Sequence, residues 1–466
     1  MKNVGRVVKD SLCTGCGACY GVCPANAVKM VIDEYGIYSP QISHELCTNC
    51  GLCLKACPGV GIDYKKYMMK IHGSLPENVA IGPYIKSYAG YVKDKLILEK
   101  AQSGGFVSSL LIYSIENNII DGAVVTSWDE NDPLSPKVYI ARDRDEILKA
   151  VGSKYNPIPV SAIIKEVSNL EGRYAFVGTS CQIQGMRKAE ENVRGLSSKI
   201  AFYIGLHCYN AINYYFQDQI LYKIKKNRSD IEYFRERDKE WRGWPCDMLI
   251  RTKDGETINI PGSISRLWPK SYFSNWRCKL CFDKFNEFSD VSCGDCRIPS
   301  HYGKKSMSEV HYSGLAKSDI VVRTKRAEEI VQKMINEGIL IVEESEVNDL
   351  ISSVRVAEKK IGVNYFSAFI EKIGGKAPEY GIKFEIEDSL NNKKNRILEA
   401  YSVLAAGHYY MCYKLTKYRA FRYLLKKTPH KLLGILESIR EKFANYKRIG
   451  NYTRLSLNVN GKKSSN

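Results

Sequence analysis

The first 60 residues carry one cysteine pattern twice. In each copy three cysteines follow one another at steps of three residues, a fourth comes four residues later, and a proline follows directly. The cysteines are Cys13, Cys16, Cys19 and Cys23 in the first run, and Cys47, Cys50, Cys53 and Cys57 in the second. Three sulfurs around one tight loop, with a fourth that reaches away, are the ligand pattern of a 4Fe-4S cluster. The spacing therefore predicts two such clusters.

The two runs are expected to share their clusters. In bacterial two-cluster ferredoxins the fourth cysteine of each run ligates the cluster of the other run. One cluster is then held by Cys13, Cys16, Cys19 and Cys57, and the other by Cys23, Cys47, Cys50 and Cys53. Gly15, Gly17 and Gly51 fit this geometry, because residues without a side chain let the backbone approach a bulky core. Disulfides suit secreted chains and zinc sites use paired CxxC units, so the spacing favours neither alternative.

The chain is much longer than a two-cluster module. It has 466 residues, of which 44% are hydrophobic, a fraction that is ordinary for globular proteins. Residues 1–10 lack the apolar segment of a signal peptide. No stretch approaches the about 18 uninterrupted apolar residues of a membrane-spanning helix. These patterns predict a cytoplasmic protein whose thiols stay reduced.

Helix and strand patterns alternate after the cysteine runs. A helix is predicted at 106–116 and buried strands at 121–128, 173–178, 200–207 and 319–324, followed by a helix and a strand over 325–350. This alternation indicates the α/β class. We expect an N-terminal two-cluster ferredoxin module of α+β type over residues 1–62, a connector over 63–90, an α/β domain over 91–350, and a basic helical extension over 351–466.

Four short signatures follow the cysteine runs in a fixed order. They are Ser103-Gly104-Gly105-Phe106, Gly152-Ser153-Lys154-Tyr155, Gly178-Thr179-Ser180-Cys181-Gln182, and Cys278-x2-Cys281 followed by Ser289-Asp290-Val291-Ser292-Cys293-Gly294-Asp295. With the ferredoxin module before them, residues 1–350 resemble the beta subunit family of coenzyme F-420 hydrogenases and dehydrogenases. That resemblance implies a flavin-binding domain with FAD and a third 4Fe-4S cluster.

The resemblance implies that the third cluster is held by Cys181, Cys208, Cys278 and Cys281. A second CxxC pair, Cys293 and Cys296, departs from the family pattern, as does Cys246. By spacing alone, a local set of Cys278, Cys281, Cys293 and Cys296 is an alternative site for zinc or for an iron-sulfur cluster. For Cys412, which lies in an aromatic helical segment, we expect core packing.

Within the same resemblance, the flavin is expected to contact Ser103, Gly104, Gly105, Lys154, Tyr155, Gly178, Thr179 and Gln182. A Ser-Gly-Gly helix start offers free amides to a pyrophosphate, although a plain helix cap explains it equally simply. Gly178 and Thr179 follow a predicted strand, at the edge where open α/β sheets bind ligands. Lys154 and Tyr155 are candidates to contact the flavin ring or phosphate; a solvated lysine beside a packed tyrosine is the alternative.

Clusters beside a flavin suit a particular kind of redox chemistry. A 4Fe-4S cluster passes one electron at a time, whereas a flavin also exchanges two. We therefore predict an oxidoreductase that connects a one-electron partner protein with a small two-electron substrate, with a connection to surface polysaccharide assembly. No catalytic acid, base or nucleophile stands out. The alternative is a non-catalytic electron-transfer subunit of a larger redox complex.

The positive charge lies mostly at the C-terminal end. From residue 390 onward, 17 Lys or Arg stand against three acidic residues, which accounts for most of the net charge of +18. Amphipathic basic helices suit an anionic membrane surface or an acidic protein, so peripheral contact with the inner membrane face is one expectation. A solvated appendage is the simpler alternative. Aromatic residues among the basic ones also occur in nucleic-acid-binding proteins, but we do not expect nucleic acid as a partner.

Overall fold

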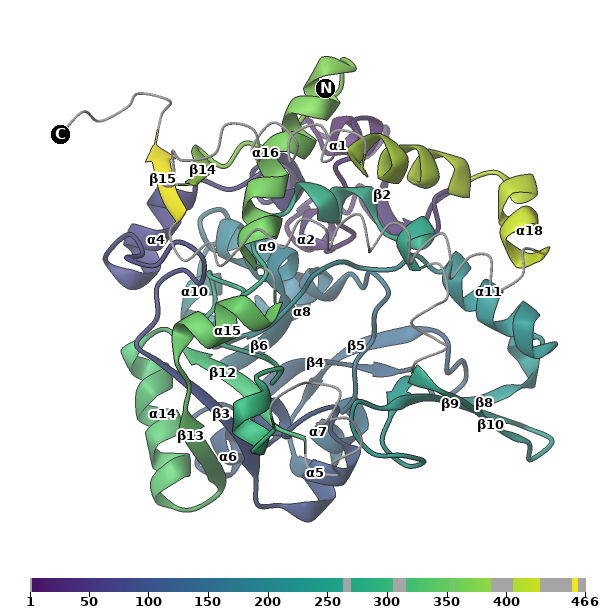
Figure 1. Ribbon diagram of the computed structural model, residues 1–466. Coiled ribbons are helices and arrows are strands. Elements are labelled where there is room, and N and C mark those ends of the chain that lie inside the picture. The colour runs from purple at the N-terminus through teal and green to yellow at the C-terminus, as the bar shows by residue number, and fades with distance from the viewer. Residues whose placement is uncertain are drawn as a thin grey trace.

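The computed structural model describes residues 2–262, 270–304, 316–354, 356–386, 405–427 and 455–459. Its centre is an eight-stranded sheet with the order β13-β3-β12-β11-β7-β6-β4-β5 (Figure 1). The strands are β3 (Lys86–Val92), β4 (Gly122–Trp128), β5 (Pro136–Ala141), β6 (Tyr174–Thr179), β7 (Ile200–Leu206), β11 (Val291–Asp295), β12 (Ser318–Val322) and β13 (Leu340–Glu344).

The sheet is mixed, with a parallel centre. Neighbouring strands are parallel from β4 through β6 and β7 to β11, whereas β5, β12, β3 and β13 are attached antiparallel. The four parallel strands therefore end at one common edge, and the segments that follow β6, β7 and β11 begin there. Ligand sites in open α/β sheets lie at this kind of edge.

The two faces of the sheet bury two separate cores. Neighbouring residues of a strand point to opposite faces, so Ala175 belongs to one core and Phe176 to the other. One core is covered by α6 (Phe106–Glu116) and α14 (Lys325–Asn336). The other is covered by α9 (Ser180–Glu190) and by the N-terminal module.

The N-terminal module consists of short helices and one hairpin. Its elements are α1 (Gly5–Lys9), α2 (Ala18–Gly21), β1 (Val28–Ile32), β2 (Tyr38–Ile42), α3 (Leu52–Lys55) and the 3-10 turn Pro58–Val60. The module packs tightly on the central domain, because a Cβ at Gly17 would lie 2.7 Å from the carbonyl oxygen of Pro159. At Gly21 a Cβ would lie 2.8 Å from the carbonyl oxygen of Ser161. Side chains at these positions would push the module away.

Residues 63–90, which the sequence predicts as a connector, belong to the folded core. They contain α4 (Tyr64–His72) and the first part of β3. Glycines and prolines in this stretch suggest a loop, but Tyr64, Tyr67 and Met68 are buried. The segment therefore joins the module to the central domain as a folded and partly buried piece of chain, and not as a loop.

Several further elements complete the central region. They are α5 (Lys95–Lys100), α7 (Arg144–Ala150), α8 (Ile164–Val167), α10 (Leu196–Lys199) and α11 (Tyr215–Ile224). A separate antiparallel sheet, which the sequence patterns do not predict, is formed by β8 (Ile231–Asp238), β9 (Asp247–Thr252) and β10 (Thr257–Ile260). None of the described helices is long and apolar enough to cross a membrane.

The C-terminal extension is not helical throughout. It contains α15 (Val347–Val354), which begins just before it, α16 (Val356–Lys372), helical residues 405–416 and α18 (Arg419–Lys427). It also contains β14 (Ile382–Ile386), which pairs antiparallel with β15 (Leu455–Val459). The predicted all-helical character is therefore wrong for these two strands. The basic stretches 387–404 and 428–454 lie outside the described residues.

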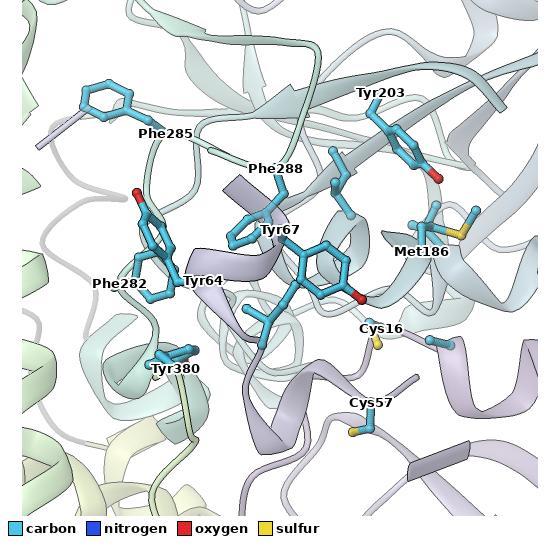
Figure 2. Close-up of a cluster of buried hydrophobic side chains, with 14 of the residues drawn as sticks. Cys16, Cys57, Tyr64, Tyr67, Met186, Tyr203, Phe282, Phe285, Phe288 and Tyr380 are labelled. Atoms are coloured by element: carbon cyan, nitrogen blue, oxygen red, sulfur yellow. The ribbon is translucent and has the colours of Figure 1, made fainter. Parts of the chain in front are cut away.

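Phe282 joins three parts of the chain in one aromatic cluster. Its ring centroid lies 5.4 Å from that of Tyr64 in α4, 4.8 Å from Tyr380 and 5.3 Å from Phe384 in the extension. Figure 2 shows Phe282 and Tyr64 side by side, with Tyr380 close to them. The extension is thus part of the same hydrophobic core as α4.

We expect Phe282→Ala to lower the free energy of unfolding by about 3–5 kcal/mol, because it removes a fully buried ring and leaves a cavity. The measurement is anaerobic urea denaturation followed by tryptophan fluorescence. Met69→Ala, at a position 48% exposed on α4, is the matched control and should change stability by less than about 1 kcal/mol. Equal effects of the two substitutions would contradict a shared core at Phe282.

Candidate redox site

The first set of thiols lies around a small cavity inside the N-terminal module. The cavity is lined by Val4, Val7, Cys13, Thr14, Cys16, Gly17, Cys19, Met30, Pro40 and Cys57. It contains three cysteines of the first run and the last cysteine of the second, which is the crossed grouping that the spacing predicts. Burial, together with the nearby Cys57 thiolate, raises the pKa of Cys16 to about 11.

The second set of thiols lies around another cavity of the same module. Cys23, Cys47, Cys50 and Cys53 are among the residues that line it. Cys50 is exposed, whereas Cys16, Cys19 and Cys57 of the first set are buried. The second set therefore lies nearer to solvent, and the first set lies nearer to the central domain.

The backbone of this module is shaped for a bulky inorganic group. Gly17 and Gly51 have φ values of 86° and 77° directly before α2 and α3, a conformation that glycine adopts without strain. The amide of Gly59 donates a hydrogen bond to the sulfur of Cys57 at 3.3 Å. Thiols held this close together, with amides directed at sulfur, fit an iron-sulfur core, which binds thiolates and neutralises part of their charge.

A third set of thiols gathers at the carboxyl edge of the parallel strands. Cys181 lies in the first turn of α9 after β6, and Cys208 follows β7. Cys278 and Cys281 come from the 3-10 turn Trp276–Leu280 and the residue after it. Burial raises the pKa of Cys181 well above its usual range, and the thiolates of Cys16, Cys208, Cys278 and Cys281 add to this effect. The loops that carry these cysteines meet, because the hydroxyl of Ser180 donates to the carbonyl oxygen of Asp283 at 2.7 Å and the amide of Cys208 donates to that of Lys284 at 3.0 Å.

The alternative set is not brought together. Cys293 belongs to the core beneath α6 and α14, whereas Cys296 belongs to the opposite core together with Trp276 and Leu280, which lie next to Cys278 and Cys281. Cys296 lies beside the buried Asp319, and burial and this carboxylate raise its pKa above the usual range. Among the described residues, no group of three or more His, Cys, Asp or Glu side chains is placed to hold a single metal ion. The zinc alternative therefore has no support in the described part of the chain.

Buried cations lie beside the first and third cysteine sets. Lys188 of α9 donates to the carbonyl oxygens of Cys57 and Gly61, both at 2.7 Å. Arg277, which precedes Cys278, donates to the carbonyl oxygens of Pro58 at 2.9 Å and Gly59 at 3.1 Å. Arg277 therefore connects the loop of the third set with the loop that carries Cys57. Sequence reasoning missed both cations because a single Lys or Arg in a helix or loop has no distinctive pattern.

The predicted flavin-contacting residues at the start of α6 are engaged within the chain. The amide of Gly104 donates to the hydroxyl of Ser318 at 3.0 Å, and the hydroxyl of Ser103 lies 2.9 Å from the same oxygen. Gly105 precedes α6 with φ 80°. A Cβ at Gly104 would collide with the carbonyl oxygen of Gly90. The Ser-Gly-Gly sequence therefore has a packing role at β3 and β12, in addition to any role toward a ligand.

The candidates after β6 form a helix cap. The side-chain oxygen of Gln182 accepts from the amide of Thr179 at 2.7 Å, and its nitrogen donates to the carbonyl oxygen of Ile158 at 2.8 Å. Thr179 and Gln182 form the capping box of α9. Gly178 accepts a hydrogen bond from Asn286 at 2.9 Å through its carbonyl oxygen. These contacts fix the first turn of α9, which carries Cys181.

Lys154 and Tyr155 lie in a polar region next to the small sheet. The ammonium of Lys154 donates to the carbonyl oxygens of Ala150 at 2.6 Å and Gly152 at 2.9 Å. Burial holds the pKa of Lys154 well below its usual range, and the charge of Arg235 adds to this. None of the ion pairs between described residues includes Lys154. A buried ammonium without a carboxylate is favourably placed for an anionic ligand.

Other polar residues of this region were not predicted. Arg237 of β8 forms an ion pair with Asp295 at 2.7 Å and donates to the hydroxyl of Tyr155 at 3.3 Å. Lys239 donates to the carbonyl oxygen of Ser103 at 2.8 Å, and Gln102 donates to the sulfur of Cys246 at 3.0 Å. This network brings the segments around residues 103 and 154 together with the end of β11. In sequence, the run of charged residues after β8 resembles a solvated loop, so this network could not be predicted from it.

Comparison with known proteins places these features in one family. Residues 87–165 and 171–348 match the models of the N-terminal and C-terminal parts of the coenzyme F420 hydrogenase/dehydrogenase beta subunit, and residues 12–61 match a 4Fe-4S dicluster domain. The coenzyme F420 hydrogenase subunit beta of Methanosarcina barkeri is 28% identical over 276 residues, which cover 56% of this chain and 83% of that protein. The coenzyme F420-dependent sulfite reductase of Methanocaldococcus jannaschii is 27% identical over 363 residues, covering 74% of this chain and 50% of that protein.

A solved structure has the same fold. It is a chain of the F420-reducing [NiFe] hydrogenase complex from Methanosarcina barkeri, with a TM-score of 0.50 and 23% sequence identity, and the match covers 65% of this chain and 98% of that chain. The two parts of the beta-subunit model together match more than half of the present chain. The protein therefore belongs to the coenzyme F420 hydrogenase/dehydrogenase beta subunit family and carries a 4Fe-4S dicluster domain before the family's two domains.

Proposed function

We propose that this chain is an iron-sulfur flavoprotein that passes electrons between a one-electron partner protein and a small two-electron substrate. The observation that carries the proposal is the position of the third cysteine set. Gly185 lies one turn after Cys181 on α9, and a Cβ at this position would lie 3.5 Å from the sulfur of Cys16 of the first set. The three sets therefore form a series from the exposed Cys50 to the carboxyl edge of the central sheet.

The third set is proposed to hold a further 4Fe-4S cluster through Cys181, Cys208, Cys278 and Cys281. Its four thiols share one region, and the amide of Ala211 donates to the sulfur of Cys278 at 3.3 Å. When bound, such a cluster supplies one-electron transfer. The residues of this chain position the ligands, and Arg277 keeps the Cys57 loop against them.

FAD is proposed to bind at the polar region around Lys154, Arg237 and Lys239. A flavin supplies the exchange between single electrons and a two-electron substrate. Neither Lys154 nor Lys239 belongs to an ion pair between described residues, so the anionic phosphates of FAD are proposed as partners of these two cations. The names of the two relatives include coenzyme F420 and sulfite, but those substrates belong to those proteins. The connection to surface polysaccharide assembly stays a prediction from the sequence.

One observation favours the alternative of a non-catalytic electron-transfer subunit. The polar groups of Ser103, Gly104, Thr179 and Gln182 bond to other groups of the chain. Gly178, Lys154 and Tyr155 also bond within the chain, so seven of the eight predicted flavin contacts have a structural role that needs no cofactor. Flavin content separates the two functions, because only the flavoprotein requires FAD.

For the third set, we expect Cys278→Ala to lower the iron content of anaerobically purified protein from about twelve to about eight atoms per chain, since one cluster holds four. Cys293→Ala is the matched comparison and should leave the iron content unchanged. Iron and sulfide analysis with electron paramagnetic resonance makes the measurement. Iron loss in Cys293→Ala without loss in Cys278→Ala would instead select the alternative set.

For the flavin, we expect about one FAD per chain in the anaerobic wild type and at least about tenfold weaker FAD binding in Lys154→Met, because the substitution removes a buried cation. Flavin absorbance and equilibrium dialysis against FAD provide the measurement. Lys137→Met, at an exposed position of β5, is the control and should bind FAD as the wild type does. Wild-type protein with full iron but no affinity for FAD would select the electron-transfer subunit.

A further inference from the structure

The C-terminal extension covers the loop that carries Cys278 and Cys281. The family match ends at residue 348, and α16 begins at Val356. The ring of Trp276, two residues before Cys278, lies 6.0 Å from Phe366 of α16 and 5.0 Å from Tyr410. The hydroxyl of Tyr380 donates to the carbonyl oxygen of Leu280 at 2.6 Å. Three separate segments of the extension therefore contact this one loop.

A buried ion pair fixes the position of α16 along this surface. The ammonium of Lys360 lies 2.6 Å from the carboxylate of Glu287, and neither side chain is accessible to solvent. The other carboxylate oxygen of Glu287 accepts from the hydroxyl of Tyr64 at 2.7 Å. Lys360 also donates to the carbonyl oxygen of Val79 at 2.5 Å. A fully buried charge pair permits little sliding, because any displacement would leave a charge without its partner.

This register places the neighbouring Lys359 at the third cysteine set. Its ammonium donates to the carbonyl oxygen of Tyr209, which follows Cys208, at 2.6 Å. Burial acts to lower the pKa of Lys359, but the thiolates of Cys281, Cys208 and Cys278 outweigh it and raise the pKa. Lys279 and Lys284 also direct their ammonium groups at the Tyr209 ring, at 5.7 and 4.9 Å from its centroid. Of these three lysines, Lys359 alone comes from outside the family match.

We propose that the extension raises the reduction potential of the third cluster through the positive charge of Lys359. The inference rests on the proposed function, since it requires that cluster. When one electron leaves the ferredoxin module and arrives at the third cysteine set, the module becomes more positive by one charge and the set more negative by one. A fixed ammonium beside the set stabilises the added negative charge more than it stabilises the oxidised state. Electron transfer toward the central domain is thereby favoured.

The test compares three variants of the full-length protein purified without oxygen. Lys359→Gln removes the charge, Lys359→Arg retains it, and Lys372→Gln removes an exposed lysine from the far end of the same helix. Redox titrations followed by electron paramagnetic resonance give the midpoint potential of each cluster. The Cys278→Ala variant identifies which signal belongs to the third cluster. We expect Lys359→Gln to shift only that signal to a more negative potential, with Lys359→Arg and Lys372→Gln unchanged.

The outcomes separate this inference from the proposed function. Wild-type protein with about eight iron atoms per chain would overturn the third cluster itself. About twelve iron atoms, with the same potential in wild type and Lys359→Gln, would overturn the role of Lys359 alone. Loss of the third cluster in Lys359→Gln but not in Lys359→Arg supports the proposal, because the charge is then required. Loss of the third cluster in both variants counts against the proposal, because the shape of the lysine side chain and not its charge would then be needed for the cluster.

Discussion

The buried guanidinium of Arg277 is the contact on which the arrangement of the redox centres depends. It donates to two carbonyl oxygens of the loop that carries Cys57, while its own loop carries Cys278 and Cys281. A buried guanidinium is costly unless its donors are satisfied, so this bond geometry holds the two loops in one relative position. Together with Lys188 of α9, which donates to the carbonyl oxygens of Cys57 and Gly61, Arg277 holds the first and third thiol sets close to each other.

Charge balance explains why so many cations lie in the interior. Thiolates around an iron-sulfur core carry net negative charge, which is unfavourable away from water. Lys188 and Lys359 reach the first and third sets from different elements, α9 and α16. The extension thus supplies part of the electrostatic environment that the family's matched domains do not contain. The basic stretch from residue 390 onward, for which a solvated appendage was one alternative, is partly interior, because Cys412, Tyr413 and Leu425 are buried.

Much of the fold could be predicted from local sequence. The strands at 122–128, 174–179 and 200–206 coincide closely with apolar runs, and the eight N-terminal cysteines group as their spacing indicates. The missed elements have weaker local signals. β8 contains alternating charges, β11 is short and includes Gly294, and β14 pairs with a strand about 70 residues away in sequence. Such pairings depend on contacts that no local window contains.

The candidate site was predictable where it depends on cysteine and not where it depends on lone polar residues. Cys181, Cys208, Cys278 and Cys281 lie in loops that meet at the carboxyl edge of the parallel strands, and their role as ligands of one cluster stays a prediction. The roles of three other features depend on partners that are distant in sequence, and so could not be predicted from local patterns. These features are Arg277, Lys359 and the network around Arg237.

The close contact at Gly17 and Gly21 has a consequence for the kinetics of the whole protein. With no side chain to separate them, α2 lies directly against residues 159–161 of the central domain. A carrier on a flexible arm must diffuse between its donor and acceptor, and its turnover then slows in viscous solvent. Here the N-terminal module is held in a fixed position against the central domain. The proposed electron transfer between the cysteine sets therefore takes place over fixed distances, so solvent viscosity is expected to affect only the encounters with the partner protein and with the substrate.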